Sequence, residues 1–353
     1  MPTHPVLRAA ALVQRHILVA MLGIYLLGGF APELGIAIKH VTLGSVGFFG
    51  ERPVALSATN LLLASMLFTS GLAISLADAR AMWQAPKALA AGVLANALVP
   101  IALLAVVAAL SRFWHDGDEA QNTLTGLALI GAMPIAGGAS VWTQNADGNV
   151  PLTVGLVLAS TMLSPLSIPL ALHAASFLTT GDYSEDLAEI AADGIITFSL
   201  VSVVLPCALG ILLRHLAGTA RVLALMPSIK VVNLVVLLTL SYTNASGALV
   251  QVVARPDYDL LAAVFAITGA MCLLAFTVGA GIAARLRCRP AETTSLVFGV
   301  GMNNSSASAV LAGTQMADHP LVLLPILAYS MTQKVLAGLV DARLRRQRDA
   351  AGN

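Results

Sequence analysis

The sequence has few charged residues and few aromatic residues for its length. Asp, Glu, Lys and Arg make up 10% of the 353 residues, aromatic residues make up 5%, and hydrophobic residues make up 58%. A soluble domain carries about a quarter charged residues. Because so apolar a chain cannot cover its surface with polar groups, a soluble globular protein is excluded, and the lipid bilayer is expected to be its main solvent.

Cysteine, basic runs and catalytic motifs are also scarce. The three cysteines are too few for a disulfide framework and lack metal-ligand spacing. The formal net charge is +1, and no basic run is interleaved with aromatic residues, which argues against nucleic acid as a partner. No His-x-x-x-His motif or pair of aspartates occurs within the hydrophobic segments. We therefore expect no enzyme activity, no catalytic residue, no metal and no cofactor.

Ten hydrophobic segments are predicted to cross the membrane as helices, since about 20 helical residues span the bilayer core. The first follows Arg15 and is interpreted as a membrane helix rather than a cleaved signal peptide, extending past Glu33. The last contains a single charge, Lys334. The predicted spans are residues 17–32, 53–77, 88–111, 120–146, 148–177, 194–213, 231–254, 260–284, 293–317 and 320–340.

The basic residues between these segments predict the orientation. With the N-terminus inside, 14 Lys and Arg residues fall in the inside segments and four in the outside segments, namely Lys39, Arg52, Arg112 and Arg255. Cytoplasmic loops carry such an excess of positive charge. We expect a multi-pass protein of the cell membrane, plasma or inner, with both termini in the cytoplasm. The basic residues of 343–348 would anchor this topology.

The predicted helices divide into two sets of five. Residues 1–178 form the first repeat, residues 187–353 form the second repeat and a short basic cytoplasmic tail, and 179–188 is the linker. Because each set has an odd number of helices, the second repeat enters the membrane from the opposite side. This arrangement is that of an inverted repeat, and such repeats are common in secondary transporters. The two repeats together would make one transmembrane domain.

The fourth helix of each set is interrupted. Residues 133–140 contain Pro134, Gly137 and Gly138, and residues 299–306 contain Asn303 and Asn304. Unwound backbone at membrane depth occurs where it lines a polar cavity, and such paired interruptions indicate a transporter site. We therefore predict a substrate site with Gly137, Gly138, Asn303, Asn304 and Ser305. The alternative is that these glycines only permit close helix packing.

Other polar residues within the spans are given a structural interpretation. Asn233 and Asn244 lie in the predicted seventh helix. Amide side chains in membrane helices often form hydrogen bonds between helices. We expect this role for both.

Several stretches make the chain similar to the bile acid:sodium symporter family over residues 16 to about 342. The resemblance implies an all-α fold of ten helices in which the broken fourth and ninth helices cross near the membrane centre. It also implies transport of an organic anion, either bile-acid-like or a smaller carboxylate. The stretches that resemble the family are residues 61–78, 134–154, 160–165, 300–304, 324–325 and 329–330.

Sodium is the coupling ion that the resemblance implies, but several of its ligand positions are replaced. Ala139, Val157 and Gly299 stand where the family has oxygen-bearing side chains. Apolar side chains offer no ligand to a hard cation. The remaining candidates for cation binding are Ser140, Thr153, Val300, Met302, Asn303 and Asn96.

Lys334 is the only charged residue well inside a predicted span. A lysine at the centre of a membrane helix costs about 2.5–3.5 kcal/mol on insertion scales, so such residues usually face a cavity or a partner. The resemblance places Gln333 and Lys334 where the tenth helix reaches the substrate. We predict that the ammonium replaces the charge of a sodium ion, with snorkelling toward the inner headgroups as the alternative.

Together these features predict a secondary active transporter of a small organic anion that works by alternating access. Its partners would be the lipid bilayer and the transported anion. Three alternatives stay open: a proton-coupled carrier, an uncoupled carrier, and a channel or sensor derived from the transporter fold.

Overall fold

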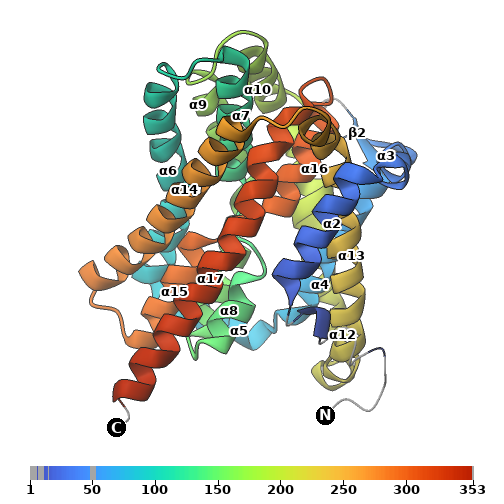
Figure 1. The fold of residues 1–353 in the computed structure, drawn as a ribbon. Coiled ribbons are helices and arrows are strands. Elements are labelled where there is room, and N and C mark those ends of the chain that lie inside the picture. The colour runs from blue at the N-terminus through green and yellow to red at the C-terminus, as the bar shows by residue number, and fades with distance from the viewer. Residues whose placement is uncertain (1–5, 7–11, 15, 48–52, 352–353) are drawn as a thin grey trace.

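The computed structural model describes the chain except for residues 1–5, 7–11, 15, 48–52 and 352–353 (Figure 1). The described part is almost entirely helical. Its elements are α2 (Ile17–Phe30), α3 (Glu33–Lys39), β1 (Thr42–Val46), β2 (Val54–Ser57), α4 (Ala58–Ala73), α5 (Leu76–Ala81), η1 (Met82–Gln84), α6 (Pro86–Ser111), α7 (Gly117–Ala132), α8 (Ala139–Asn145), α9 (Val150–Ser176), α10 (Asp182–Ala192), α11 (Ile195–Phe198), η2 (Ser199–Val204), α12 (Leu205–Ala217), α13 (Thr219–Ala254), α14 (Tyr258–Arg285), α15 (Pro290–Gly301), α16 (Ser305–Gln315), η3 (Pro320–Val322) and α17 (Leu323–Ala351).

The helices confirm an all-α, multi-pass membrane protein. Among the described residues, six helical runs are long and apolar enough to cross a membrane, and two bent pairs, α2–α3 and α4–α5, raise the number to eight. The six runs are Pro86–Ser111, Val150–Ser176, Ile195–Ala217, Thr219–Ala254, Tyr258–Arg285 and Pro320–Leu344. The other two predicted spans, the fourth and the ninth, consist of shorter helices, so the count of ten stays a prediction.

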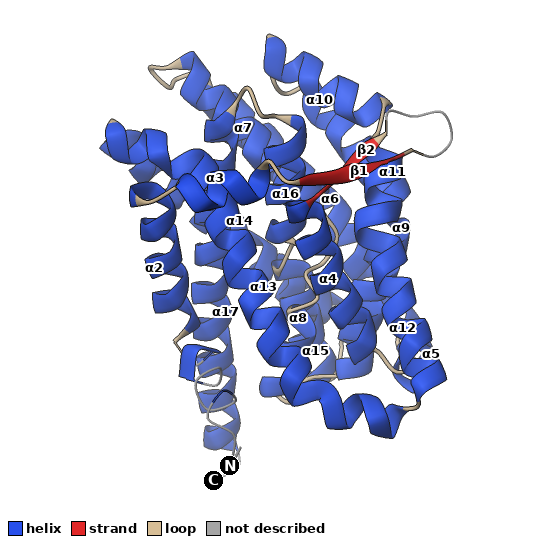
Figure 2. Ribbon diagram, turned by 90° about the vertical axis from the view of Figure 1, so that its right-hand side faces the viewer, coloured by secondary structure: helices blue, strands red, loops and turns tan. Residues whose placement is uncertain are grey.

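The start of the chain differs from the prediction. The first helix does not continue past Glu33, because the chain bends by 91° between α2 and α3. The second predicted span begins as a strand: β1 and β2 pair antiparallel, with Val46 opposite Val54. Figure 2 shows this hairpin at the same end of the molecule as α7 and α10. Hydropathy alone does not distinguish an apolar strand from the helix that follows it.

Two further boundaries differ. Helix α13 begins at Thr219, twelve residues before the predicted start at 231, because Lys230 marked the limit of the uncharged segment but does not end the helix. Most of the predicted linker is helical, since α10 begins at Asp182. Its apolar residues Leu187 and Ile190 belong to the hydrophobic core.

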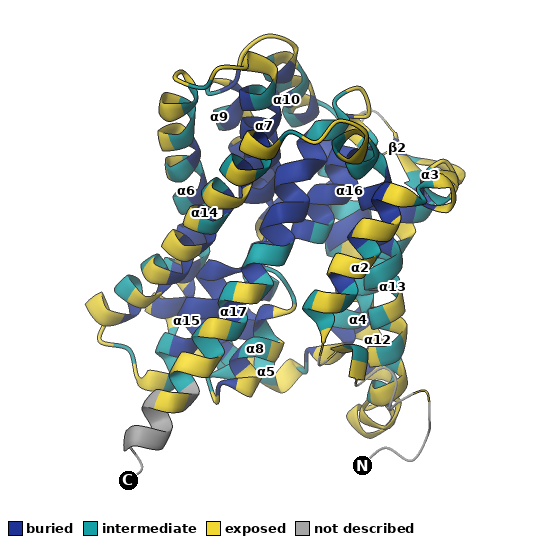
Figure 3. Ribbon diagram, viewed as in Figure 1, coloured by how far each residue is buried: buried dark blue, intermediate teal, exposed yellow. Residues whose placement is uncertain are grey.

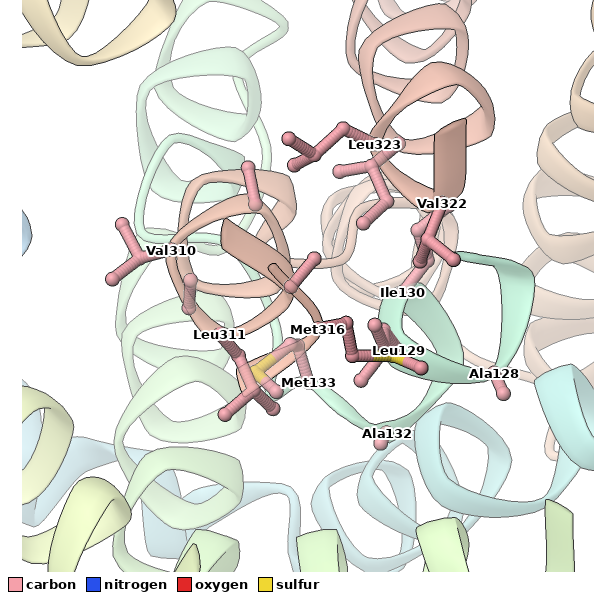
Figure 4. Packing of buried hydrophobic residues seen from close by; sticks show 14 of the residues in the cluster. Ala128, Leu129, Ile130, Ala132, Met133, Val310, Leu311, Met316, Val322 and Leu323 are labelled. Atoms are coloured by element: carbon pink, nitrogen blue, oxygen red, sulfur yellow. The ribbon is translucent and has the colours of Figure 1, made fainter. Parts of the chain in front are cut away.

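The shorter helices α15 and α16 lie in the interior of the bundle. Figure 3 shows them mostly buried, whereas α6, α14 and α2 expose much of their surface. Exposed leucines such as Leu94 and Leu98 of α6 suit contact with lipid tails. Figure 4 shows the side chains of Ile130 in α7 and of Met133, which follows it, near those of α16 and the start of α17. This packing fixes the two broken segments against each other.

Candidate functional site

Two helix interruptions meet inside the bundle. Helix α7 ends at Ala132 and α8 begins at Ala139, while α15 ends at Gly301 and α16 begins at Ser305. The two interruptions pair through an antiparallel bridge between Ile135 and Asn303. The backbone N–H of Ala136 donates to the Met302 carbonyl at 2.9 Å, and that of Asn304 donates to the Pro134 carbonyl at 2.9 Å. The predicted interruptions and their meeting are thus confirmed. Each break satisfies backbone groups that the other has lost from its helix.

The side chain and the backbone of Asn303 join the breaks to two further helices, α6 and α17. Asn303 is 2% exposed. Its Nδ2 donates to the Ile130 carbonyl at 3.1 Å, and its Oδ1 accepts from Nδ2 of Asn96 at 3.2 Å. Its backbone N–H donates to Oε1 of Gln333 at 2.9 Å. A buried amide with this many partners is primarily a structural link at the crossing.

Asn304 and Ser305 begin helix α16. Oδ1 of Asn304 accepts from the backbone N–H of Ala307 at 3.2 Å, which makes Asn304 the N-cap of the helix. Ser305 and its neighbour Ser306 face a pocket instead. Of the two predicted site residues, Ser305 therefore has its hydroxyl group free to bind a ligand.

A narrow polar pocket lies between helices α2 and α13 on one side and α16 and α17 on the other. Its volume of about 10 Å³ is that of roughly one water molecule. Among the described residues, the side chains of Ser241, Asn244, Ser305 and Ser306 have no hydrogen-bond partner. The polar lining consists of Tyr25, Ser241, Asn244, Ser305, Ser306 and Ser330, and the apolar lining of Leu240, Ala309, Ile326 and Leu327. We call this set the polar pocket.

Lys334 lies beside one end of the polar pocket. Its Nζ donates to the carbonyl of Ser330 at 3.0 Å and to the Ser330 hydroxyl at 2.8 Å. The ammonium thus points toward the preceding turn of α17, away from residues 343–348. Lys334 therefore does not snorkel toward residues 343–348 in this structure. No carboxylate in the described part of the chain forms an ion pair with Lys334. Within the described residues it is a cation without a counter-charge, and it is hydrogen-bonded to Ser330 of a pocket that has unpaired polar groups.

Gly137, Gly138 and Ser140 lie apart from the polar pocket. The Ser140 hydroxyl donates to the Gly137 carbonyl at 2.8 Å. A Cβ on Gly137 would lie 2.8 Å from Oγ of Ser70, so this glycine permits a close approach to α4. The structure thus brings together Ser305 with the surroundings of Lys334, and places the two glycines elsewhere at the break.

The implied sodium ligands do not form an oxygen-rich cage. Thr153 is paired with Thr143, with 3.0 Å between their hydroxyl oxygens. Val300 and Met302 are buried and have no oxygen in their side chains. A Cβ on Gly299 would lie 2.6 Å from Cδ1 of Leu156, so the leucine fills the space in which a longer side chain would extend. A hard cation prefers six or more oxygen ligands, or several waters, and these residues do not fit one.

Apolar packing replaces that cage. We call it the apolar cluster, and it lies mainly on α6, α8, α9, α14 and α15. Trp142 stacks against Phe298 with 6.2 Å between ring centroids. The buried members are Ala88, Leu89, Ile135, Ala139, Ala146, Leu152, Leu156, Val157, Phe276, Ala283, Leu296, Val297, Phe298, Met302 and Ala337.

The sequence interpretation missed part of the polar pocket. Asn233 does bond across helices, since its Oδ1 accepts from the Thr69 hydroxyl at 3.2 Å. The same expectation is wrong for Asn244, which has no hydrogen bond within the described residues and lines the pocket. The signal available in the sequence was the run of small and polar residues at 241–246 within an otherwise apolar helix.

A larger cavity of about 410 Å³ lies at the ends of α7, α13 and α14. It is lined by Glu119, Arg255 and Asp257 among others. Burial raises the pKa of the Glu119 carboxyl above its ordinary value. None of the predicted site residues lines this cavity, so it is separate from the crossing.

Comparison with known proteins agrees with this geometry. The model of the sodium bile acid symporter family matches residues 60–255, which is more than half of the chain. The uncharacterized protein YbaS of Bacillus subtilis is 29% identical over 225 residues, covering 64% of this chain and 69% of that protein. The probable sodium/metabolite cotransporter BASS1 of Arabidopsis thaliana chloroplasts is 26% identical over 279 residues, covering 78% of this chain and 64% of that protein. With its crossed, broken helices and its family match, the chain belongs to the sodium bile acid symporter family and is a membrane transporter rather than an enzyme.

Proposed function

We propose that this transporter is a secondary active carrier of a small organic anion that uses Lys334, rather than a bound sodium ion, as its positive charge. The observation that carries the proposal is the ammonium of Lys334, which lacks a carboxylate partner in the described chain and is hydrogen-bonded to Ser330 at the polar pocket. Buried cations are costly without a partner, so a lysine retained at such a position favours an anionic ligand.

The polar pocket supplies the other contacts. An arriving carboxylate would accept hydrogen bonds from the Lys334 ammonium and from the hydroxyls of Ser305 and Ser306. The Asn244 amide would bind a further polar group. Because the pocket holds roughly one water, the anion enters only when α13 and α16 move apart, and such movement is what alternating access requires.

The proposal includes ten spans in two inverted repeats, with both termini in the cytoplasm of a cell membrane. The two broken segments, α7–α8 and α15–α16, occupy the fourth and ninth places when the helices are counted along the chain. The asymmetry of 14 basic residues against four supports the orientation. Reporter fusions after Gly117, Gly181 and Asp257 should lie outside, and fusions after Pro86, Gly218 and Pro290 inside.

Sodium coupling is not part of the proposal, although one relative is named a probable sodium/metabolite cotransporter. The space beside Gly299 is filled by Leu156, and Ala139 and Val157 pack in the apolar cluster. That relative's name specifies a metabolite and the family description a bile acid, and both a small carboxylate and a bile-acid-like anion stay candidates for the substrate. Proton coupling through Lys334 and uncoupled transport are the alternatives for the driving force. A channel or a sensor is the alternative to a carrier.

Counterflow in proteoliposomes tests the carrier. Vesicles loaded with unlabelled pyruvate or taurocholate should transiently accumulate the labelled anion, and Lys334→Gln should abolish the accumulation. Lys230→Gln is the matched control, because Lys230 is an exposed lysine on α13 and should behave as wild type. Equilibration without accumulation would indicate a channel, and full activity of Lys334→Gln would refute the role of the ammonium.

A further inference from the structure

Lys39 places a second cation between helices α13 and α16, which also line the polar pocket. The bend after α2 turns α3 across the bundle, at the end opposite the C-terminal part of α17 (Figure 1). Lys39 is the last residue of α3, and its side chain extends between α13 and α16. A Cβ on Gly247 would lie 3.5 Å from Nζ of Lys39, and one on Gly313 would lie 3.8 Å from it. The absence of side chains at both glycines leaves the space that the ammonium occupies.

The Lys39 ammonium has no partner in the described part of the chain. It is half-buried, and neither a hydrogen bond nor an ion pair is formed with it. Gly313 lies in the last turn of α16, where the carbonyl groups offer a partial negative charge but not a full one. A half-buried ammonium without a counter-charge among the described residues therefore lies at the junction of two helices that must separate during transport.

Asn244 connects Lys39 to the polar pocket. Its Oδ1 would lie 3.8 Å from a Cβ on Gly313, the same point that lies 3.8 Å from the Lys39 ammonium. The Asn244 side chain is 5% exposed, has no hydrogen bond within the described residues, and lines the pocket. An unpaired buried amide is therefore directed toward the space that leads to Lys39.

The two lysines lie near different residues of α17. A Cβ on Gly247 would lie 3.5 Å from both Cδ1 of Leu323 in α17 and Nζ of Lys39. The hydroxyl of Ser330 accepts a hydrogen bond from Lys334. Seven residues separate Leu323 from Ser330, which is about 10 Å along a helix. Ser305 and Ser306 line the polar pocket, which Ser330 and Asn244 also line. Hydrogen-bonding groups that are unpaired within the described residues thus lie near both lysines.

We propose that Lys39 and Asn244 form a second anion-binding position, next to the polar pocket and apart from Lys334. Its ligand is the carboxylate of an organic anion, which binds there before it reaches Lys334. This proposal rests on the proposed function in one respect only, namely the kind of anion that binds. Separation of α13 from α16 would expose the Lys39 ammonium to the solution on that side of the membrane.

Acetylation of lysine side chains tests the position without requiring transport. The chain has four lysines, Lys39, Lys87, Lys230 and Lys334, so each is followed separately by peptide mass spectrometry. The full-length protein in lipid nanodiscs is treated with a water-soluble acetylating ester, with and without saturating pyruvate or taurocholate. We expect one of the anions to slow acetylation of Lys39 but not of Lys87 or Lys230, and Asn244→Leu to remove this protection. Absence of protection, or equal protection of Lys87, would overturn the proposal.

Uptake kinetics separate anion binding from a structural role. Lys39→Gln should raise the KM of uptake from the Lys39 side by about tenfold, as expected for one lost charge-assisted contact, and change the maximal rate little. Lys39→Arg should restore the KM, because the cation is kept. A lower melting temperature and a lower rate with an unchanged KM would mean that Lys39 only supports the fold. If the wild-type protein transports neither anion, the proposed function fails, and the acetylation result still decides on Lys39.

Discussion

The two sides of the helix crossing differ in how their polar groups are satisfied. On the α15 side, the apolar cluster packs Leu156 against Gly299 and Trp142 against Phe298, and the position of an implied cation ligand is occupied by hydrocarbon. On the α16 side, Ser305 and Asn244 lack hydrogen-bond partners, and the two nearby lysines lack counter-charges, as far as the described residues are concerned. The first arrangement stabilises the fold. The second costs stability, and such costs are expected where a ligand supplies the missing partners.

The largest expected effect is the introduction of a carboxylate into the apolar cluster. Gly299→Glu should lower the free energy of unfolding by more than about 3 kcal/mol, because its Cβ would overlap Leu156 and a charge would be buried without a partner. Thermal melting in detergent measures this. Adding Leu156→Ala should recover part of the loss, since the two sites are in contact.

A control separates steric overlap from the general effect of replacing a helical glycine. Gly299→Ala should destabilise the protein, whereas Gly23→Ala should not, because nothing lies within 4 Å of a Cβ at Gly23. Equal melting temperatures for the two alanine variants would contradict the tight packing at Gly299.

The crossing itself should respond less strongly. Asn303→Ala removes the hydrogen bonds to the Ile130 carbonyl, which keeps its bond from the Met133 N–H, and to the buried amide of Asn96, which loses this partner, at a cost of about 2–3 kcal/mol. Asn233→Ala, which loses one bond to Thr69, is the comparison and should cost about 1 kcal/mol. If the two variants melt alike, Asn303 does not hold the breaks together.

The polar pocket should show the smallest effect on stability and a clear effect on binding. Replacing both Ser305 and Ser306 by alanine should change the free energy of unfolding by less than about 0.5 kcal/mol, because neither hydroxyl has a hydrogen-bond partner among the described residues. The affinity for the transported anion should nevertheless fall by about tenfold. Isothermal titration and melting curves on the same preparations measure the two quantities. A large loss of stability with unchanged affinity would assign these serines to the fold instead.

Much of the architecture was predictable from the sequence, because the signals were local. Pro134 and the adjacent asparagines Asn303 and Asn304 interrupt apolar runs, and proline and paired small residues weaken a helix wherever they occur. Their pairing across the bundle followed from their matching places in the two halves. Lys334 was conspicuous because charge is rare inside a span.

What the sequence could not reveal depends on distant contacts. Asn233 and Asn244 lie on one helix and have the same side chain, yet among the described residues only Asn233 has a hydrogen-bond partner, Thr69 of α4. The role of Lys39 depends on a 91° bend that hydropathy does not encode. In the sequence, Leu156 does not differ from other core leucines, and only the structure shows its contact with Gly299. Long-range packing, rather than residue type, decided each of these cases.

The most direct test of a carrier that uses a lysine in place of sodium is anion uptake with sodium replaced by choline. Wild-type proteoliposomes should take up the anion at the same rate in either salt, because the implied sodium ligands are replaced by the apolar cluster. Lys334→Gln should lose uptake in both, while Lys230→Gln retains it. Uptake that requires sodium and survives Lys334→Gln would contradict the account.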